Sequence, residues 1–150
     1  MTRMQLIIII FLFICGCAKA QNNASEKQTE SMLLEFYTKH FQIWTNTPAT
    51  VPANMLYEKL DSLMQKYCTL KLRNNAKKAF KYVGADFVTN ELMGNLNENL
   101  KIEKATKENE YIVSFVATHS DAPGGAIKKQ AILHVTVVKE GESYKIDSVK

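Results

Sequence analysis

The chain has 150 residues and a formal net charge of +4 at pH 7, and its 46% hydrophobic content suits one globular domain. Its lysines and arginines are spread along the sequence without a dense run and interleaved aromatic residues, which argues against nucleic-acid binding. Three cysteines are too few for a disulfide framework once export processing is considered.

The first twenty residues have the pattern of an export signal. Arg3 gives a positively charged start, and residues 6–14 form an unbroken apolar run. This run suits the core of a signal peptide and is much shorter than the roughly 20 residues of a transmembrane helix. We therefore expect an exported protein without a permanent transmembrane anchor.

A lipidation signal follows the apolar run. Gly16 stands directly before Cys17, and Ile14 lies three positions before that cysteine, which is the arrangement of a lipobox. We expect residues 1–16 to be a lipoprotein signal peptide and Cys17 to be lipidated, so that acyl chains anchor the protein to a bacterial membrane. Ala18 after the cysteine favours an outer membrane, with the domain facing the periplasm or the cell surface.

A second cleavage site stays open as an alternative. The small-x-small run at residues 18–20 fits ordinary secretion with cleavage before Gln21, which would release a soluble protein. In the lipoprotein case, we expect residues 17–28 to form a flexible polar tether and residues 29–150 to form a single domain.

Three helices are predicted in the first half of that domain. Apolar residues at three-to-four spacing define the first helix, with Ser25 or Thr29 as its N-cap, and the prolines within residues 46–53 end it. A second helix is expected over residues 54–67 and a weaker third over residues 70–82. The apolar stripe of the first helix consists of Met32, Leu33, Phe36, Tyr37, His40, Phe41 and Trp44.

From about Leu100 the apolar period changes to two, which predicts strands. Turn-forming pairs at residues 108–109, 124–125 and 140–141 separate four such segments, and sequential antiparallel pairing is then the simplest topology. We expect an α+β domain in which two to three N-terminal helices pack on a curved four-stranded antiparallel sheet. Residues 118–129 are predicted to be a long loop.

No motif of known chemistry occurs in the mature chain. It has no phosphate-binding glycine loop, no zinc-protease helix motif and no nucleophile elbow. His40, His119 and His134 are far apart and lack supporting carboxylate spacing, so we predict no metal site, no cofactor and no catalytic residue. Cys68 has no disulfide partner in the mature chain, and we expect it to be a small buried residue at a helix end.

The candidate pocket residues are mostly aromatic. Amphipathic rings on the first two helices could line a concave pocket at the open end of a helix-covered sheet, although the same spacing also suits core packing. Asp86 could point into this pocket or cap a turn. The candidate pocket consists of Tyr37, His40, Trp44, Tyr67, Asp86 and His134.

Four segments of the mature chain are similar to a known family. They are Leu34-Glu35-Phe36-Tyr37, Lys66 to Leu72, Gly84-Ala85-Asp86-Phe87 and Tyr144 to Val149. With these segments the chain resembles the domain-of-unknown-function 3828 family of exported bacterial proteins and lipoproteins over nearly its whole mature length. The resemblance implies a cystatin-like, nuclear-transport-factor-2-like α+β cone and a structural Cys68, and it brings no established activity.

Two classes of function follow from the sequence. The favoured class is a noncatalytic binding or accessory lipoprotein that holds a protein partner or a small ligand at the cell envelope. The alternative is a small pocket hydrolase or isomerase, with His40 or Asp86 as the base and Tyr37 or Tyr67 as the proton donor. An inhibitor or immunity protein that blocks a toxin or a protease is a further alternative.

Overall fold

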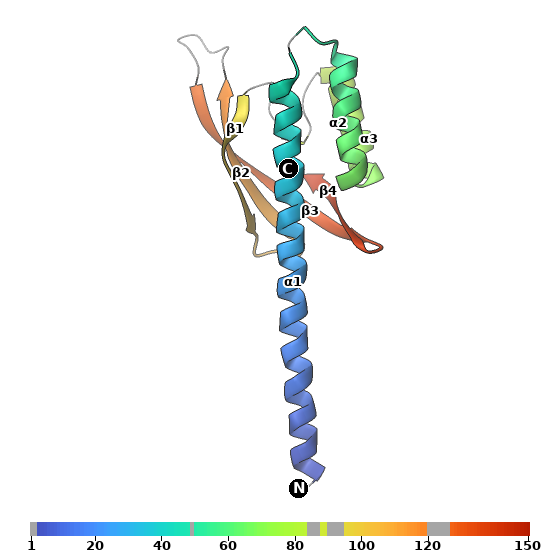
Figure 1. Ribbon diagram of the computed structural model, residues 1–150, viewed down its shortest axis with the longest axis vertical. Helices are drawn as coiled ribbons and strands as arrows, with labels where there is room; N and C mark the ends of the chain where they lie inside the picture. Colours follow the sequence, from blue (N-terminus) through green and yellow to red (C-terminus); the bar gives the residue numbers. More distant parts are fainter. Residues whose placement is uncertain (1–2, 49, 84–87, 90–94, 120–126) are drawn as a thin grey trace.

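Three helices come first in the chain and four strands follow them (Figure 1). The computed structural model describes residues 3–48, 50–83, 88–89, 95–119 and 127–150, and it describes their side chains except at 3–22, 83, 95–98 and 118–119. The helices are α1 (Arg3–Asn46), α2 (Ala53–Tyr67) and α3 (Leu70–Val83), and the strands are β1 (Asn95–Lys104), β2 (Glu110–His119), β3 (Ile127–Glu140) and β4 (Ser143–Val149). The predicted α+β class, with helices preceding a four-stranded antiparallel sheet, is confirmed.

The sheet has the order β1-β2-β3-β4, and each strand pairs antiparallel with the next. Two of the predicted turn residues allow this meander: Asn109 has a φ of 58° and Gly141 a φ of 61°. Asparagine and glycine tolerate this left-handed conformation better than other residues do. Sequential pairing, as expected from the short turns, is therefore confirmed.

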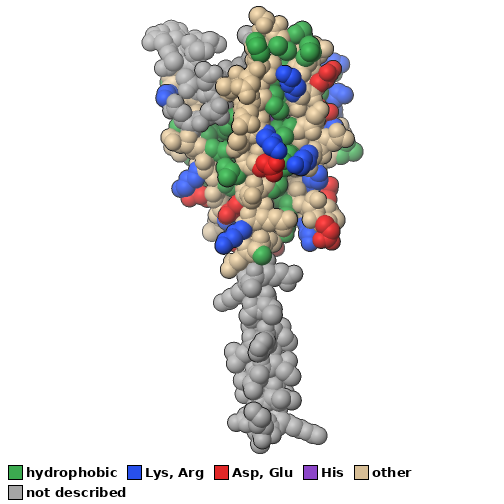
Figure 2. All heavy atoms as spheres, in the orientation of Figure 1, with side chains coloured by type: hydrophobic (Ala, Val, Ile, Leu, Met, Phe, Trp, Pro, Cys, Tyr) green, Lys and Arg blue, Asp and Glu red, His purple; other side chains and the backbone are tan. Residues whose placement is uncertain are grey.

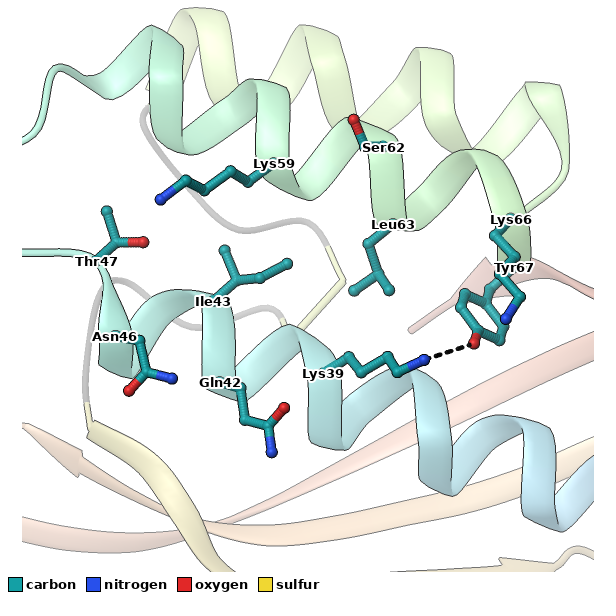
Figure 3. Close-up of a pocket in the computed structure, with 10 residues that line it drawn as sticks. All are labelled: Lys39, Gln42, Ile43, Asn46, Thr47, Lys59, Ser62, Leu63, Lys66 and Tyr67. Atoms are coloured by element: carbon teal, nitrogen blue, oxygen red, sulfur yellow. Dashed lines mark hydrogen bonds between the residues drawn. The ribbon is translucent and has the colours of Figure 1, made fainter.

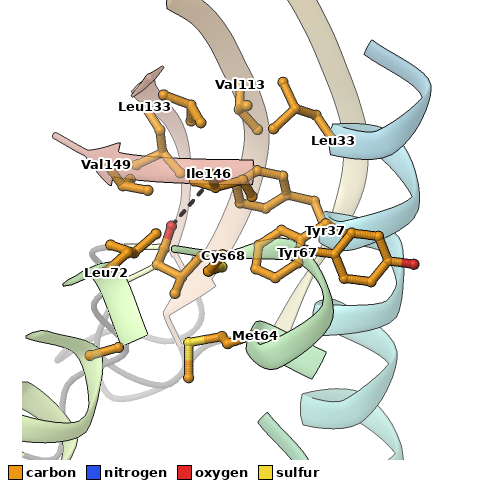
Figure 4. Packing of buried hydrophobic residues seen from close by; sticks show 14 of the residues in the cluster. Leu33, Tyr37, Met64, Tyr67, Cys68, Leu72, Val113, Leu133, Ile146 and Val149 are labelled. Carbon is orange, nitrogen blue, oxygen red and sulfur yellow. Dashed lines mark hydrogen bonds between the residues drawn. The ribbon is translucent and has the colours of Figure 1, made fainter. Parts of the chain in front are cut away.

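The hydrophobic core lies between the sheet and the helices (Figure 4). The buried hydrophobic residues of α1 are at most 1% exposed, and Phe41 places its ring centroid 5.1 Å from that of Phe115 on β2. Each fully buried large apolar side chain contributes about 1.5–3 kcal/mol. The α1 residues in this core are Leu33, Phe36, Tyr37 and Phe41.

The junction between α2 and α3 docks on the last strand. Cys68 forms a parallel bridge with Ile146, and the Thr69 amide donates a hydrogen bond to the Ile146 carbonyl at 2.9 Å. Cys68 is 4% exposed, and burial raises the pKa of its thiol to about 12. The expectation of a small buried cysteine at a helix end is confirmed.

Polar contacts hold α3 in place beside that junction. The Thr69 hydroxyl accepts a hydrogen bond from the Leu72 amide at 3.3 Å, which caps the start of α3. The same hydroxyl donates to Asp147 at 3.1 Å, and Lys71 pairs with that carboxylate at 2.7 Å. Polar side chains thus tie the helical hairpin to β4.

The expected flexible tether is wrong for the part nearest the domain. Residues 21–28 belong to α1, which runs without a break from Arg3 to Asn46. These residues contain no glycine or proline, and Thr29 is buried against the sheet, so nothing interrupts the helix. The Thr29 hydroxyl donates to the Ser25 carbonyl at 2.9 Å within this helix, so neither residue is an N-cap.

The expected long loop over residues 118–129 is also shorter than predicted. The β2–β3 ladder continues through Thr118 opposite Lys128 and His119 opposite Ile127. Backbone pairing needs no apolar alternation, and the first four residues of β3 are all exposed. Of the predicted loop, residues 120–126 lie outside the described residues.

Candidate functional site

A groove of about 530 Å³ lies between α1 and α2 (Figure 3). On each helix four lining residues at positions i, i+3, i+4 and i+7 form one stripe along a helix face, and α2 adds Tyr67 at position i+8. The helices run in opposite directions, so the two stripes face each other in reverse order (Figure 1). The α1–α2 groove is lined by Lys39, Gln42, Ile43, Asn46 and Thr47 of α1 and its following turn, and by Lys59, Ser62, Leu63, Lys66 and Tyr67 of α2.

One end of the groove is a cluster of charged groups around a tyrosine hydroxyl. Glu35 accepts a hydrogen bond from the Lys39 amine at 2.6 Å, and its carboxylate lies 3.7 Å from the Lys66 amine. Lys39 also donates to the Tyr67 hydroxyl at 3.5 Å, and the Lys66 amine lies 4.8 Å from the centre of that ring.

These contacts keep the end of the groove ionised at neutral pH. The hydrogen bonds from Lys39 and Tyr67 lower the pKa of Glu35 to about 2. The hydrogen bond to Glu35 raises the pKa of Lys39, and the contact with Tyr67 raises the pKa of Lys66. Two ammonium groups and one carboxylate therefore stay charged there.

The centre of the groove is apolar and its other end is basic. Ile43 and Leu63, both partly buried, face each other across the centre (Figure 3). At the far end the Lys59 side chain extends toward Thr47, and within the described part of the chain no carboxylate pairs with its amine. Figure 2 shows basic side chains along the boundary between α1 and α2, with acidic groups among them.

Two of the candidate pocket residues lie in the core. Tyr37 and His40 are 0% and 1% exposed, and neither lines the α1–α2 groove. The Tyr37 hydroxyl donates to the Val88 carbonyl at 3.4 Å, and the His40 ring packs 5.8 Å from the ring of Phe36. Their helical spacing reflects packing within the core.

The other candidates are dispersed over the molecule. Tyr67 lines the groove, whereas Trp44 packs partly buried against the core. His134 is exposed on the sheet face turned away from the helices, with its Nδ1 atom 3.5 Å from a Glu110 carboxylate oxygen. Asp86 lies outside the described residues. The structure therefore does not gather the described members of the predicted pocket around one cavity.

Sequence reasoning missed most of the groove residues. The signal was present as two matching stripes, each with a single aliphatic residue, Ile43 or Leu63, among polar ones. What the sequence lacks is the relative placement of α1 and α2, because a helical period does not say which stripes of two helices meet.

A second cavity, of about 380 Å³, lies where the middle of α1 crosses the turn ends of the sheet. One of its two lining lysines is already engaged: the Lys104 amine donates to the carbonyls of Lys107 and Glu110 at 2.9 and 3.2 Å. Its lining residues include Glu26, Thr29, Tyr111 and Tyr144.

The described residues hold neither a metal-binding cluster nor a membrane-spanning helix. No group of three or more histidine, cysteine or acidic side chains among them is arranged to hold a metal ion. None of the described helical segments combines the length and apolar character that crossing a membrane requires.

Comparisons with known proteins bear on the fold alone. No family model matches the sequence, and no curated protein matches it. The chain is similar to a crystal structure of a protein of unknown function from Bacteroides thetaiotaomicron VPI-5482, with a TM-score of 0.71 and 20% identity over 91% of this chain and 98% of that one. The two proteins share the fold, and the resemblance to the domain-of-unknown-function 3828 family stays a prediction.

Proposed function

We propose that this protein is a lipoprotein of the bacterial cell envelope that binds a partner and catalyses no reaction. The observation that carries the proposal is the α1–α2 groove, which combines an apolar centre with basic ends. The groove has the volume of a ligand site, for which about 300–1,000 Å³ is usual. Protein surfaces of this kind recognise a partner by shape and by complementary charge.

The protonation states in the groove favour binding over proton transfer. A general acid or base works best with a pKa near the operating pH. Here the pKa of Glu35 is lowered to about 2, and those of Lys39 and Lys66 are raised, so each group keeps its charge at pH 7. Fixed charges attract and orient a ligand, and they do not exchange protons with it.

The enzyme alternative has less support from the described residues. One candidate base, His40, and one candidate proton donor, Tyr37, are buried in the core and line neither of the two cavities described above. The other candidate donor, Tyr67, lines the groove, and the other candidate base, Asp86, lies outside the described residues. A substrate would have to displace the packing of α1 on the sheet to reach His40 or Tyr37. An inhibitor that blocks another protein is compatible with the groove, since its target would be one kind of protein partner.

A lipid on Cys17 would hold the domain near the membrane. Ser25 lies eight positions after Cys17 and lines the cavity at the end of the sheet. As helix, this stretch spans about 12 Å, given a rise of about 1.5 Å per residue. Lys39 follows 14 residues after Ser25 on the same helix, so the groove would lie about 20 Å farther from the lipid. A partner in the surrounding compartment would then reach it.

Native mass spectrometry of protein extracted gently from its own envelope tests both parts of the proposal. We expect a species that begins at Cys17, carries acyl chains and retains a stoichiometric partner or ligand. The Cys17→Ser variant should lose the acyl mass and leave the membrane fraction, whereas Cys15→Ser should not. A bare chain that begins at Gln21 would refute the anchor, and a lipidated chain that never retains anything would refute the binding role.

A further inference from the structure

The charges of the α1–α2 groove are unequally compensated, which defines what can bind there. Lys39 is paired with Glu35 at 2.6 Å, and Lys66 shares the same carboxylate at the longer distance of 3.7 Å. Lys59 has no ion-pair partner among the described residues. An anionic ligand therefore meets one unpaired ammonium group at one end and one weakly paired ammonium group at the other.

The spacing of these two lysines sets the distance between the anionic groups of a ligand. Lys59 and Lys66 lie seven positions apart on one face of α2, which corresponds to about 10 Å along the helix. Successive side chains of an extended peptide point to opposite faces, and the chain advances about 3.3 Å per residue. Two of its side chains four residues apart therefore share one face about 13 Å apart, and the long lysine side chains can span the difference from their own spacing. A carboxylate on each of them can reach one lysine.

Between these two lysines the groove offers apolar surface to a ligand. Ile43 and Leu63 face each other there and are partly buried, so an aliphatic side chain placed on them removes further apolar surface from water (Figure 3). The polar groups of Gln42, Asn46 and Ser62 border this patch and can bond to a peptide backbone.

The shape of the groove favours a polypeptide segment over an enclosed small molecule. The groove between the two helices is largely open to solvent, whereas sites for small molecules bury about 70–90% of the ligand surface. We propose that the α1–α2 groove binds an extended acidic segment of a protein partner, with two carboxylates four residues apart and an aliphatic side chain midway between them on the same face. This assignment rests on the proposed binding function and names its ligand class.

Fluorescence anisotropy with the full-length protein tests the assignment. The probe is a fluorescein-labelled peptide, Gly-Gly-Glu-Ala-Leu-Ala-Glu-Gly-Gly, and its comparison peptides carry glutamine in place of both glutamates or place the two glutamates next to each other. We expect the first peptide to bind at least about tenfold more tightly than either comparison peptide, because only it matches both lysines and the apolar centre. Equal binding of all three peptides would overturn the assignment.

A matched pair of double variants separates the groove from the general charge of the protein. Lys59→Gln with Lys66→Gln should raise the Kd at least about tenfold, whereas Lys77→Gln with Lys78→Gln removes the same charge from α3, outside the groove, and should change the Kd less than about twofold. All four lysines are exposed, so both variants should fold, which circular dichroism verifies. Equal weakening by both variants would overturn the assignment in favour of nonspecific attraction.

Two further outcomes distinguish failure of this assignment from failure of the proposed function. If suberate, an aliphatic dicarboxylate of similar length, competes as well as the unlabelled peptide, the peptide assignment is overturned and a small-molecule ligand replaces it. If none of the peptides binds while the native complex retains a partner, the assignment fails and the binding function stands. If the native protein also retains nothing, both fail.

Discussion

The two sides of α1 pack against different neighbours, and their side chains differ in how far they are buried. The side toward the sheet places Leu33, Phe36 and Phe41 in the core at no more than 1% exposure, whereas the side toward α2 leaves Lys39 exposed and Ile43 only partly buried. A sheet face offers continuous apolar surface, while the facing stripe of α2 offers one aliphatic residue among polar ones. An interface of the second kind stays open enough to admit a ligand.

The largest effect expected from this contrast is a core truncation on the closed side. Leu33→Ala should lower the free energy of unfolding by about 3–4 kcal/mol, because it removes a fully buried side chain and leaves a cavity. Leu34→Ala, at a neighbouring position that is 47% exposed, is the control and should cost less than about 1 kcal/mol. Urea unfolding followed by circular dichroism measures both, and similar losses would contradict the assigned orientation of α1.

An intermediate effect is expected at the joint between α2 and α3. Thr69→Ala should lower the free energy of unfolding by about 1–2 kcal/mol, since it removes the cap of α3 and the hydrogen bond to Asp147. Thr69→Ser keeps the hydroxyl and should cost less than half as much in the same urea titration. If the two variants are equally unstable, the methyl group rather than the hydrogen bonds is responsible.

A truncation in the groove should cost less than the same truncation in the core. Leu63→Ala removes the same atoms as Leu33→Ala from a partly buried position, and we expect a loss of about 1 kcal/mol. The urea midpoints of these two variants compare the two sides of α1 directly. A loss at Leu63 equal to that at Leu33 would mean that the groove is a closed part of the core in solution.

The smallest effect concerns the pH dependence of stability at the edge of the helical layer. The hydrogen bond from Lys71, together with that from Thr69, lowers the pKa of Asp147 below its ordinary value of 3.8. A carboxyl with a lowered pKa stabilises the fold above the ordinary value, and this contribution is lost as the pH falls through 3.8 and below.

Variants at Asp147 and at a surface carboxylate test this pH dependence. The wild type should lose unfolding free energy on acidification, and Asp147→Asn should reduce this loss by less than about 1 kcal/mol, as is usual for a partly exposed pair. Urea midpoints of the wild type and the variant, taken from about pH 6 to pH 2.5, measure this difference. Glu142→Gln on the exposed β3–β4 turn is the charge-matched control, and the change of its urea midpoint over this pH range should equal that of the wild type.

Most of the fold follows from residue patterns that depend on local sequence. The prolines after α1, the periodic leucines of α2 and the turn residue Gly141 predict helix ends, helix faces and strand order, and the structure agrees with them. The errors lie where the pattern is weak. Residues 21–28 continue a helix without an apolar stripe, and Ile127 to Gln130 pair by backbone without apolar alternation.

The candidate site was less predictable for a physical reason. Tyr37 and His40 were predicted to line a pocket because their rings combine an apolar body with a polar group. Such rings also pack well in a core, and here both residues are buried. The groove depends on how α1 and α2 lie against each other, which is decided by side chains from both helices and from the sheet. Lysines on a helix, such as Lys59, appear in sequence as ordinary solvated residues.

The continuity of α1 has a mechanical consequence. The helix that starts near the N-terminus is also the one whose Leu33, Phe36 and Tyr37 form the core, so any tension on the N-terminus passes along a single rod into the packed interior. The rod lies along the sheet, and such a load acts as shear across many side-chain contacts at once instead of peeling one element away (Figure 1). A pull on the first helix is therefore resisted by side-chain contacts throughout the core.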